Sequence, residues 1–144
     1  MKKLFLFVSM ALTVSVSAMA KEDKLINEAQ LPNNAQSFLQ SYFSEEKVDN
    51  VIREGKSNDY EVTLVSGAEV DFDHSGSWKE VDCNYERVPS LLVPSAILNK
   101  VANRYGIDAQ IIWIKRTKKG YEIELNNGVE VSFNKRYKIL SKKF

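Results

Sequence analysis

The side chains with the most evident chemical potential lie in an acidic segment, DFDHSGSWKEVD, at 71–82. Oxygen-bearing side chains occupy positions 1, 3, 5 and 12 of this segment: Asp71, Asp73, Ser75 and Asp82. Gly76 stands at position 6, where the sharp turn of a calcium-binding loop requires glycine. The spacing is that of a calcium loop, so it predicts calcium as one possible ligand.

A plain β-turn explains the same residues. Phe72 continues an alternating strand pattern, and no helical pattern flanks the segment, whereas a calcium loop of this kind lies between two helices. Asp, Ser and Gly are also common turn residues. A related segment further along the chain has Asn134, Lys135 and Arg136 without an acidic cluster. We therefore favour the turn and keep calcium as the alternative.

The sequence contains no arrangement typical of an enzyme. Glu61 and Glu69, like Glu122 and Glu130, fall on one exposed face of a predicted sheet. Nothing on such a face separates the pKa values of a catalytic acid and base. Motifs of serine hydrolases, zinc proteases and phosphate-binding loops are absent from the sequence. We expect no catalytic activity and no cofactor.

Cys83 is the only cysteine of the chain. A nucleophilic thiol needs a neighbouring base, and the sole histidine, His74, lies in a different local context. An intermolecular disulfide is the other reactive role. A buried position just past a hairpin suits Cys83 better than either, because free cysteines are among the most buried residues.

A duplicated segment must position these residues. YEVTLVSGAEVDFD at 60–73 and YEIELNNGVEVSFN at 121–134 are identical at seven of fourteen positions. Both copies alternate apolar and polar residues around a Gly-containing turn, which predicts a β-hairpin in each. The apolar residues of each hairpin share one face, and the acidic residues share the other, which we expect to be solvated.

Helical spacing precedes each hairpin, at 31–43 and at 93–106. Strand patterns lie before the hairpins, at 47–54 and 110–116, and after them, at 77–82 and 137–140. The sequence thus predicts an α+β two-layer domain of two tandem helix-plus-four-stranded antiparallel repeats, about 30–83 and 92–140, with the helices covering one sheet face.

The first twenty residues have the three parts of a secretory signal. Lys2 and Lys3 precede a short apolar run, and an A-x-A cleavage site ends at Ala20. The run is shorter than the roughly 20 apolar residues of a membrane span. We predict a signal peptide at 1–20, cleavage after Ala20, a single domain at 21–144 and a periplasmic or secreted protein without membrane insertion.

The order of these motifs resembles a known family. The motifs are L-P-x-x-A-x-x-F-L at 31–39, Y-E-V-x-L-x-x-G-x-E-V-x-F-D at 60–73 and G-x-W-x-E-V-D-C at 76–83. Together they are similar to exported PepSY-like proteins, which share a fold with β-lactamase inhibitor protein, over about residues 30–140. The resemblance implies a two-repeat α+β fold, a periplasmic setting and no established catalytic activity, and by analogy with the inhibitors it suggests an inhibitory or protein-binding function. Inhibitors with this fold are braced by disulfides, whereas this chain has one cysteine.

Charge divides the chain into two unlike parts. Residues 21–90 contain 15 acidic and 7 basic residues, a net charge of −8, whereas residues 91–144 contain 4 and 11, a net charge of +7. The two parts either complement each other within the fold, or the basic part steers a partner. The export signal separates the protein from nucleic acid.

We therefore predict a non-catalytic binding module whose partner is a protein of the cell envelope, with inhibition as one form of that function. Aromatic and basic residues are the candidates for the contact. They are Trp78, Tyr85, Trp113, Lys115, Arg116, Lys118 and Lys119. The alternative is a periplasmic protein that binds a small ligand or calcium at the 71–82 segment.

Overall fold

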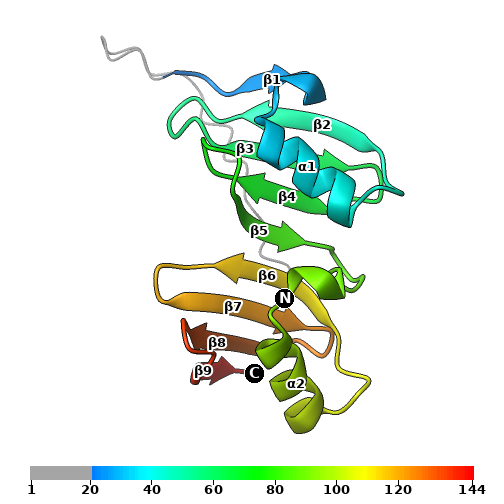
Figure 1. The fold of residues 1–144 in the computed structure, drawn as a ribbon, viewed down its shortest axis with the longest axis vertical. Coiled ribbons are helices and arrows are strands. Elements are labelled where there is room, and N and C mark those ends of the chain that lie inside the picture. Colours follow the sequence, from blue (N-terminus) through cyan, green and yellow to red (C-terminus); the bar gives the residue numbers. More distant parts are fainter. Residues whose placement is uncertain (1–20) are drawn as a thin grey trace, which may run out of the picture.

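The computed structural model describes residues 21–144, which form one continuous antiparallel sheet with two short helices (Figure 1). The predicted signal peptide and its cleavage site fall on residues 1–20, outside the described residues. The strands are β1 (Lys24–Ile26), β2 (Val48–Arg53), β3 (Tyr60–Leu64), β4 (Glu69–Phe72), β5 (Trp78–Asp82), β6 (Ile111–Arg116), β7 (Gly120–Leu125), β8 (Glu130–Asn134) and β9 (Ile139–Lys143). Their spatial order is their sequence order, and each pairs with the next.

The predicted fold class is wrong in its division of the chain. The described residues do not form two helix-plus-four-strand repeats; they form a single open nine-stranded sheet and are mostly strand. The sheet continues across the predicted boundary because β5 pairs with β6, with Val81 opposite Ile114 and both fully buried. An additional strand, β1, pairs with β2. Pairing hides edges that separate units would expose.

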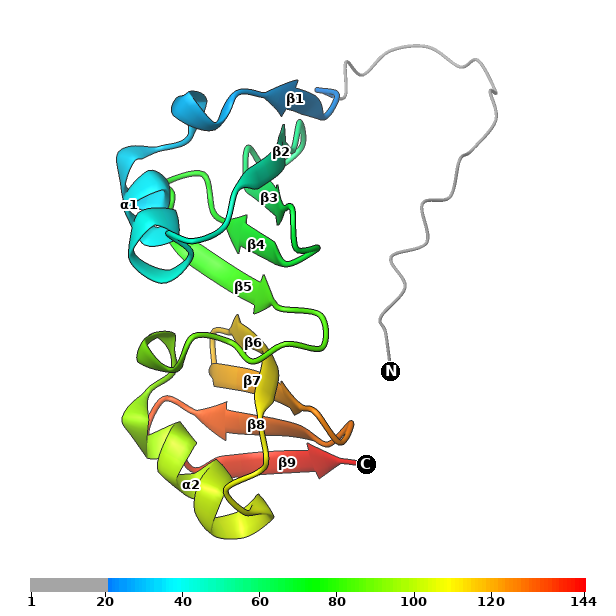
Figure 2. The same cartoon turned by 90° about the vertical axis from the view of Figure 1, so that its right-hand side faces the viewer.

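Both helices lie on the same side of the sheet (Figure 2). Helix α1 (Asn33–Tyr42) follows Pro32, and α2 (Ser95–Tyr105) follows Pro94, which suits the start of a helix because proline has no N–H to satisfy. Each helix buries residues four apart, Ala35 with Leu39 and Ile97 with Val101. Short 3-10 turns precede them at Glu28–Gln30 and Ser90–Leu92.

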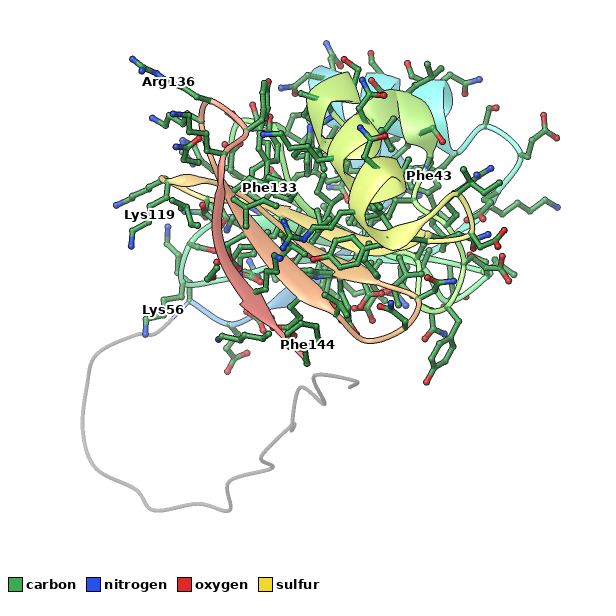
Figure 3. The ribbon with its side chains drawn as sticks, turned by 90° about the horizontal axis from the view of Figure 1, so that it is seen from below. Phe43, Lys56, Lys119, Phe133, Arg136 and Phe144 are labelled. Carbon is green, nitrogen blue, oxygen red and sulfur yellow. The ribbon has the colours of Figure 1, made fainter. Side chains whose placement is uncertain are left out.

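The core lies between the helices and the sheet. Phe72 and Phe133 occupy the same place in the two hairpins and are 0% and 1% exposed. Phe38 of α1 packs edge-on against Phe72, with 5.3 Å between ring centroids. Figure 3 shows Phe133 on the sheet beside α2. None of the helices in the described part of the chain is long and apolar enough to span a membrane.

Candidate functional site

The helix-free face of the sheet carries rows of carboxylates. Because side chains alternate along a strand, the residues between the buried positions of each hairpin point away from the helices. Glu61, Asp71 and Glu80 stand opposite one another on β3, β4 and β5, and Glu69 stands opposite Asp82. Like charges directly opposite each other destabilise a sheet. This part of the face therefore holds electrostatic repulsion that the fold does not require.

Burial and charge repulsion together raise the pKa values of three of these groups. Burial, followed by the charges of Glu80 and Glu61, raises the pKa of Asp71 to about 7. Burial and the neighbouring carboxylates also raise the pKa values of Glu61 and Glu69. The sequence predicted a solvated acidic face. Glu69 is exposed as expected, but Glu61 and Asp71 are half-buried, and their burial contributes most to the rise in their pKa values.

Two cations offset part of this charge. Lys79 Nζ lies 2.7 Å from Asp59 Oδ2, and this hydrogen bond raises the pKa of Lys79. At the junction of β5 and β6, Glu80 accepts a hydrogen bond from the indole N–H of Trp113 at 2.6 Å and pairs with Lys115 at 3.5 Å. The acidic and basic parts of the chain thus complement each other locally at this junction.

The predicted calcium loop has a different geometry. Asp73 Oδ1 accepts hydrogen bonds from the backbone N–H groups of Ser75 and Ser77 and from the Ser75 hydroxyl, which closes a turn. Burial acts to raise the pKa of Asp73, but these hydrogen bonds outweigh it and the pKa is lowered. Asp71 and Asp82 lie instead on neighbouring strands of the sheet face.

The second hairpin makes the same turn without a carboxylate. Asn134 Oδ1 accepts from the backbone N–H groups of Arg136 and Lys138, both at 2.9 Å. Asp73 therefore has the role of a turn residue. Among residues 21–144, no three His, Cys, Asp or Glu side chains are grouped so as to hold a metal ion.

A groove of about 620 Å³ opens on the helix-free face in the C-terminal half. It lies over β6 to β9 and the turn between β6 and β7. The residues that line it are Trp113, Thr117, Lys118, Lys119, Tyr121, Glu122, Ile123, Glu130, Val131, Ser132, Phe133, Leu140, Ser141 and Lys143. An aromatic side chain, aliphatic surface, hydroxyls and charges of both signs meet there, a combination suited to non-covalent binding.

The structure brings three of the predicted contact residues together. Trp113, Lys118 and Lys119 all line the groove, and Lys115 lies beside it at the β5–β6 junction. Figure 3 shows Lys119 projecting from the same edge of the molecule as Arg136.

The other predicted contact residues do not line this groove. The Arg116 guanidinium lies over the Trp78 ring, 4.8 Å from its centroid, and Trp78 also packs against Phe38 of α1. This pair belongs to the helix side of the sheet. Tyr85 lies in the loop after β5 and is exposed.

The sequence did not predict the groove residues that come from β8 and β9. Leu140, Ser141 and Lys143 come from β9, and Ser132 comes from β8. One signal was available, because Ser132 occupies the position of Asp71 in the first hairpin. A small hydroxyl in place of a carboxylate leaves space on the second half of the face.

Cys83 is buried, as the sequence predicted. Burial raises the pKa of its thiol to about 12. A thiol with so high a pKa remains protonated near neutral pH and is a poor nucleophile.

Comparison with protein families decides where this fold belongs. The model of the family described as "Putative beta-lactamase-inhibitor-like, PepSY-like" matches residues 18–64 and 58–141. The chain belongs to this PepSY-like family. Two overlapping matches are consistent with a tandem arrangement of the family's motif, as the duplicated hairpins indicated. No curated protein matches the chain.

Three solved structures that are similar to this chain come from Bacteroides species. A "putative calcium-regulated periplasmic protein" of Bacteroides thetaiotaomicron is 36% identical, with a TM-score of 0.82, over 85% of this chain and 97% of that one. A "putative periplasmic protein" of Bacteroides vulgatus is 35% identical, with a TM-score of 0.80, over 87% and 99%. A second from that organism, of unknown function, is 32% identical, with a TM-score of 0.80, over 85% and 99%. These descriptions support a periplasmic location.

Proposed function

We propose that this chain is a non-catalytic binding module of the periplasm and that it contacts a protein partner through the groove on its helix-free face. The observation that carries the proposal is the convergence of Trp113, Lys118 and Lys119 on that groove. Tryptophan is enriched at the energetic centres of protein interfaces. Lysines at the rim of an interface accelerate the encounter with an acidic partner.

Physical features of the groove support a binding role over a catalytic one. Trp113 is half-buried, and its indole is oriented by the hydrogen bond to Glu80, so little side-chain entropy is lost when a partner contacts it. The lining contains neither histidine nor cysteine. Inhibition of an envelope enzyme is one outcome of such binding, and it follows only if the groove covers that enzyme's active site.

The experiment compares two charge reversals on neighbouring turns. Lys118→Glu with Lys119→Glu alters the groove, whereas Lys135→Glu with Arg136→Glu alters the β8–β9 turn, whose residues do not line it. Both pairs are exposed, so neither change should lower the melting temperature appreciably. A partner captured from periplasmic extract should bind the first variant at least about tenfold more slowly and keep its rate with the second. Equal losses for the two variants would contradict a role for the groove.

A second candidate function is a response to calcium. The like-charged rows of Asp71, Glu61 and Glu80 favour it, because a bound cation would relieve their repulsion. One structural relative is described as calcium-regulated. Because no three acidic side chains among residues 21–144 are arranged to hold a metal ion, calcium would act through the summed negative charge of the sheet face rather than through a preformed site or the Asp73 turn.

Thermal unfolding with and without calcium tests this second function. A protein that binds calcium gains stability as the calcium concentration exceeds its dissociation constant. The gain should disappear in Asp71→Asn and persist in Asp73→Asn, because Asn134 shows that an amide closes the same turn. A melting temperature that does not respond to calcium removes this candidate.

A further inference from the structure

Within residues 21–144 the sheet has two open edges, the outer edge of β1 and the outer edge of β9. Among residues 21–144, β9 pairs only with β8, and no strand lies on its other side. β9 follows the second copy of the hairpin just as β5 follows the first. Both last strands contain the same irregularity, a bulge opposite Phe72 in one case and opposite Phe133 in the other.

The two strands correspond residue by residue. Val70 pairs with Val81 as Val131 pairs with Lys142, and Glu69 pairs with Asp82 as Glu130 pairs with Lys143. The pairing of β5 with β6 therefore shows which backbone groups of β9 are available for hydrogen bonds at its outer edge.

On β5 the covering strand is β6, which runs antiparallel to it. The backbone N–H of Cys83 donates to the carbonyl of Ile112 at 3.0 Å, so this side of the strand points toward β6. Backbone groups alternate in direction along an antiparallel strand. The N–H of Lys142, which corresponds to Val81, accordingly points to the outer edge of β9.

The charges on β9 determine which kind of segment could pair with its outer edge. At the β5–β6 junction, Glu80 stands opposite Lys115, and the two side chains form an ion pair. On β9 the residue equivalent to Glu80 is Ser141, and Lys142 and Lys143 stand where β5 has Val81 and Asp82. Pairing with β9 of a second copy would place lysines near lysines, which is unfavourable. Acidic side chains are the complement.

Apolar surface accompanies these lysines. Leu140 is 53% exposed, and Phe144, just beyond β9, is 98% exposed (Figure 3). Leu140 and Lys143 also line the groove, so a strand added to β9 would extend the same sheet face and border it. The occupant therefore combines acidic with apolar residues.

We propose that the outer edge of β9 binds an extended acidic segment of a protein partner as a tenth strand of the sheet. This inference deepens the proposed binding function and rests on it, because the added strand would belong to the partner that fills the groove. Backbone hydrogen bonds to β9 would supply affinity, and the lysines would select an acidic segment.

The test titrates the isotopically labelled protein with two hexapeptides, one of alternating glutamate and valine and one of alternating lysine and valine. The acidic peptide should bind about tenfold more tightly and shift the amide signals of Lys142 and Phe144. Lys142→Ala removes a charge but keeps the N–H, and it should weaken binding about threefold. Lys142→Pro removes the outward N–H at an edge that tolerates proline, and it should abolish binding.

A second test alters the peptide instead of the protein, so it does not depend on whether the Lys142→Pro variant folds. Methylating alternate peptide nitrogens removes its backbone donors, and binding to the unaltered protein should be lost for one of the two methylation patterns. Full affinity for both methylated peptides, or equal affinity for the acidic and basic peptides, overturns the inference. This assay uses peptides and does not use the Lys118 and Lys119 variants. A negative result here therefore contradicts strand addition to β9 alone, and the charge-reversal experiment tests the groove separately.

Discussion

At the scale of single residues, comparison of equivalent positions in the two hairpins distinguishes side chains that the fold requires from side chains that are free to serve a function. Asp73 and Asn134 close the same turn with the same pair of backbone hydrogen bonds, so the charge of Asp73 is not needed for the turn. Asp71 and Ser132 occupy equivalent positions on the helix-free face, yet only the first is ionisable. The row of Glu61, Asp71 and Glu80 is therefore a property of the first half, whereas the second half keeps a single opposed pair, Glu124 with Glu130.

Asp71 gives a pH-dependent prediction. Its pKa rises from an ordinary 3.8 to about 7 in the folded protein, so the folded state binds the proton more tightly than the unfolded chain does. Stability from this group is therefore greatest below pH 4 and declines as the pH rises to about 7. Asp71→Asn should remove that decline and stabilise the protein at pH 8 by about 1–2 kcal/mol, allowing for solvent screening.

Urea unfolding at pH 5 and pH 8 measures this difference. Asp108→Asn, in the exposed loop after α2, is the matched control and should leave the pH dependence unchanged. A decline of the same size in the Asp71→Asn protein would show that other groups cause it.

At the scale of elements, alternation and helical spacing located most of the secondary structure. The pattern around Phe72 and Phe133 predicted both hairpins, and the prolines at 32 and 94 marked the starts of both helices. Burial of Trp78 was not predictable in the same way, because its contacts with Phe38 and Arg116 join segments distant in sequence.

Truncation of the aromatic residues tests this packing. Phe72→Ala and Phe133→Ala should each cost about 3–5 kcal/mol of unfolding free energy, because both rings are fully buried. Trp78→Ala should cost roughly half as much, since this side chain is only half-buried. Chemical denaturation of the three variants gives the comparison. A cost at Trp78 equal to that at Phe72 would mean that Trp78 belongs fully to the core.

At the scale of the whole molecule, the sequence predicted one domain of two four-stranded repeats, and the structure has one continuous nine-stranded sheet. The duplicated hairpins were visible in the sequence, but the pairing that joins them depends on Val81 meeting Ile114 and on Glu80 meeting both Trp113 and Lys115. Such contacts between segments about 30 residues apart leave no periodic signal. The groove was hidden for the same reason, since its two walls come from β6 and β9.

The continuous sheet predicts cooperative unfolding. Because β5 and β6 share buried residues and the Glu80 hydrogen bond, loss of one half exposes the edge of the other. Calorimetry of the chain should give one transition whose calorimetric and van't Hoff enthalpies agree. Glu80→Ala should lower its midpoint without splitting it. Two resolved transitions in the unaltered protein would show that the halves fold independently.

The claim that the helix-free groove is the binding surface is tested most directly by site-specific photo-crosslinking in the periplasm. A photoreactive phenylalanine analogue replaces Ser132 on the floor of the groove in one variant and Asn99 on the exposed surface of α2 in another. If the partner binds in the groove, a discrete protein adduct forms from position 132 and none forms from position 99. Adducts from position 99 alone, or the same adducts from both positions, would contradict binding in the groove.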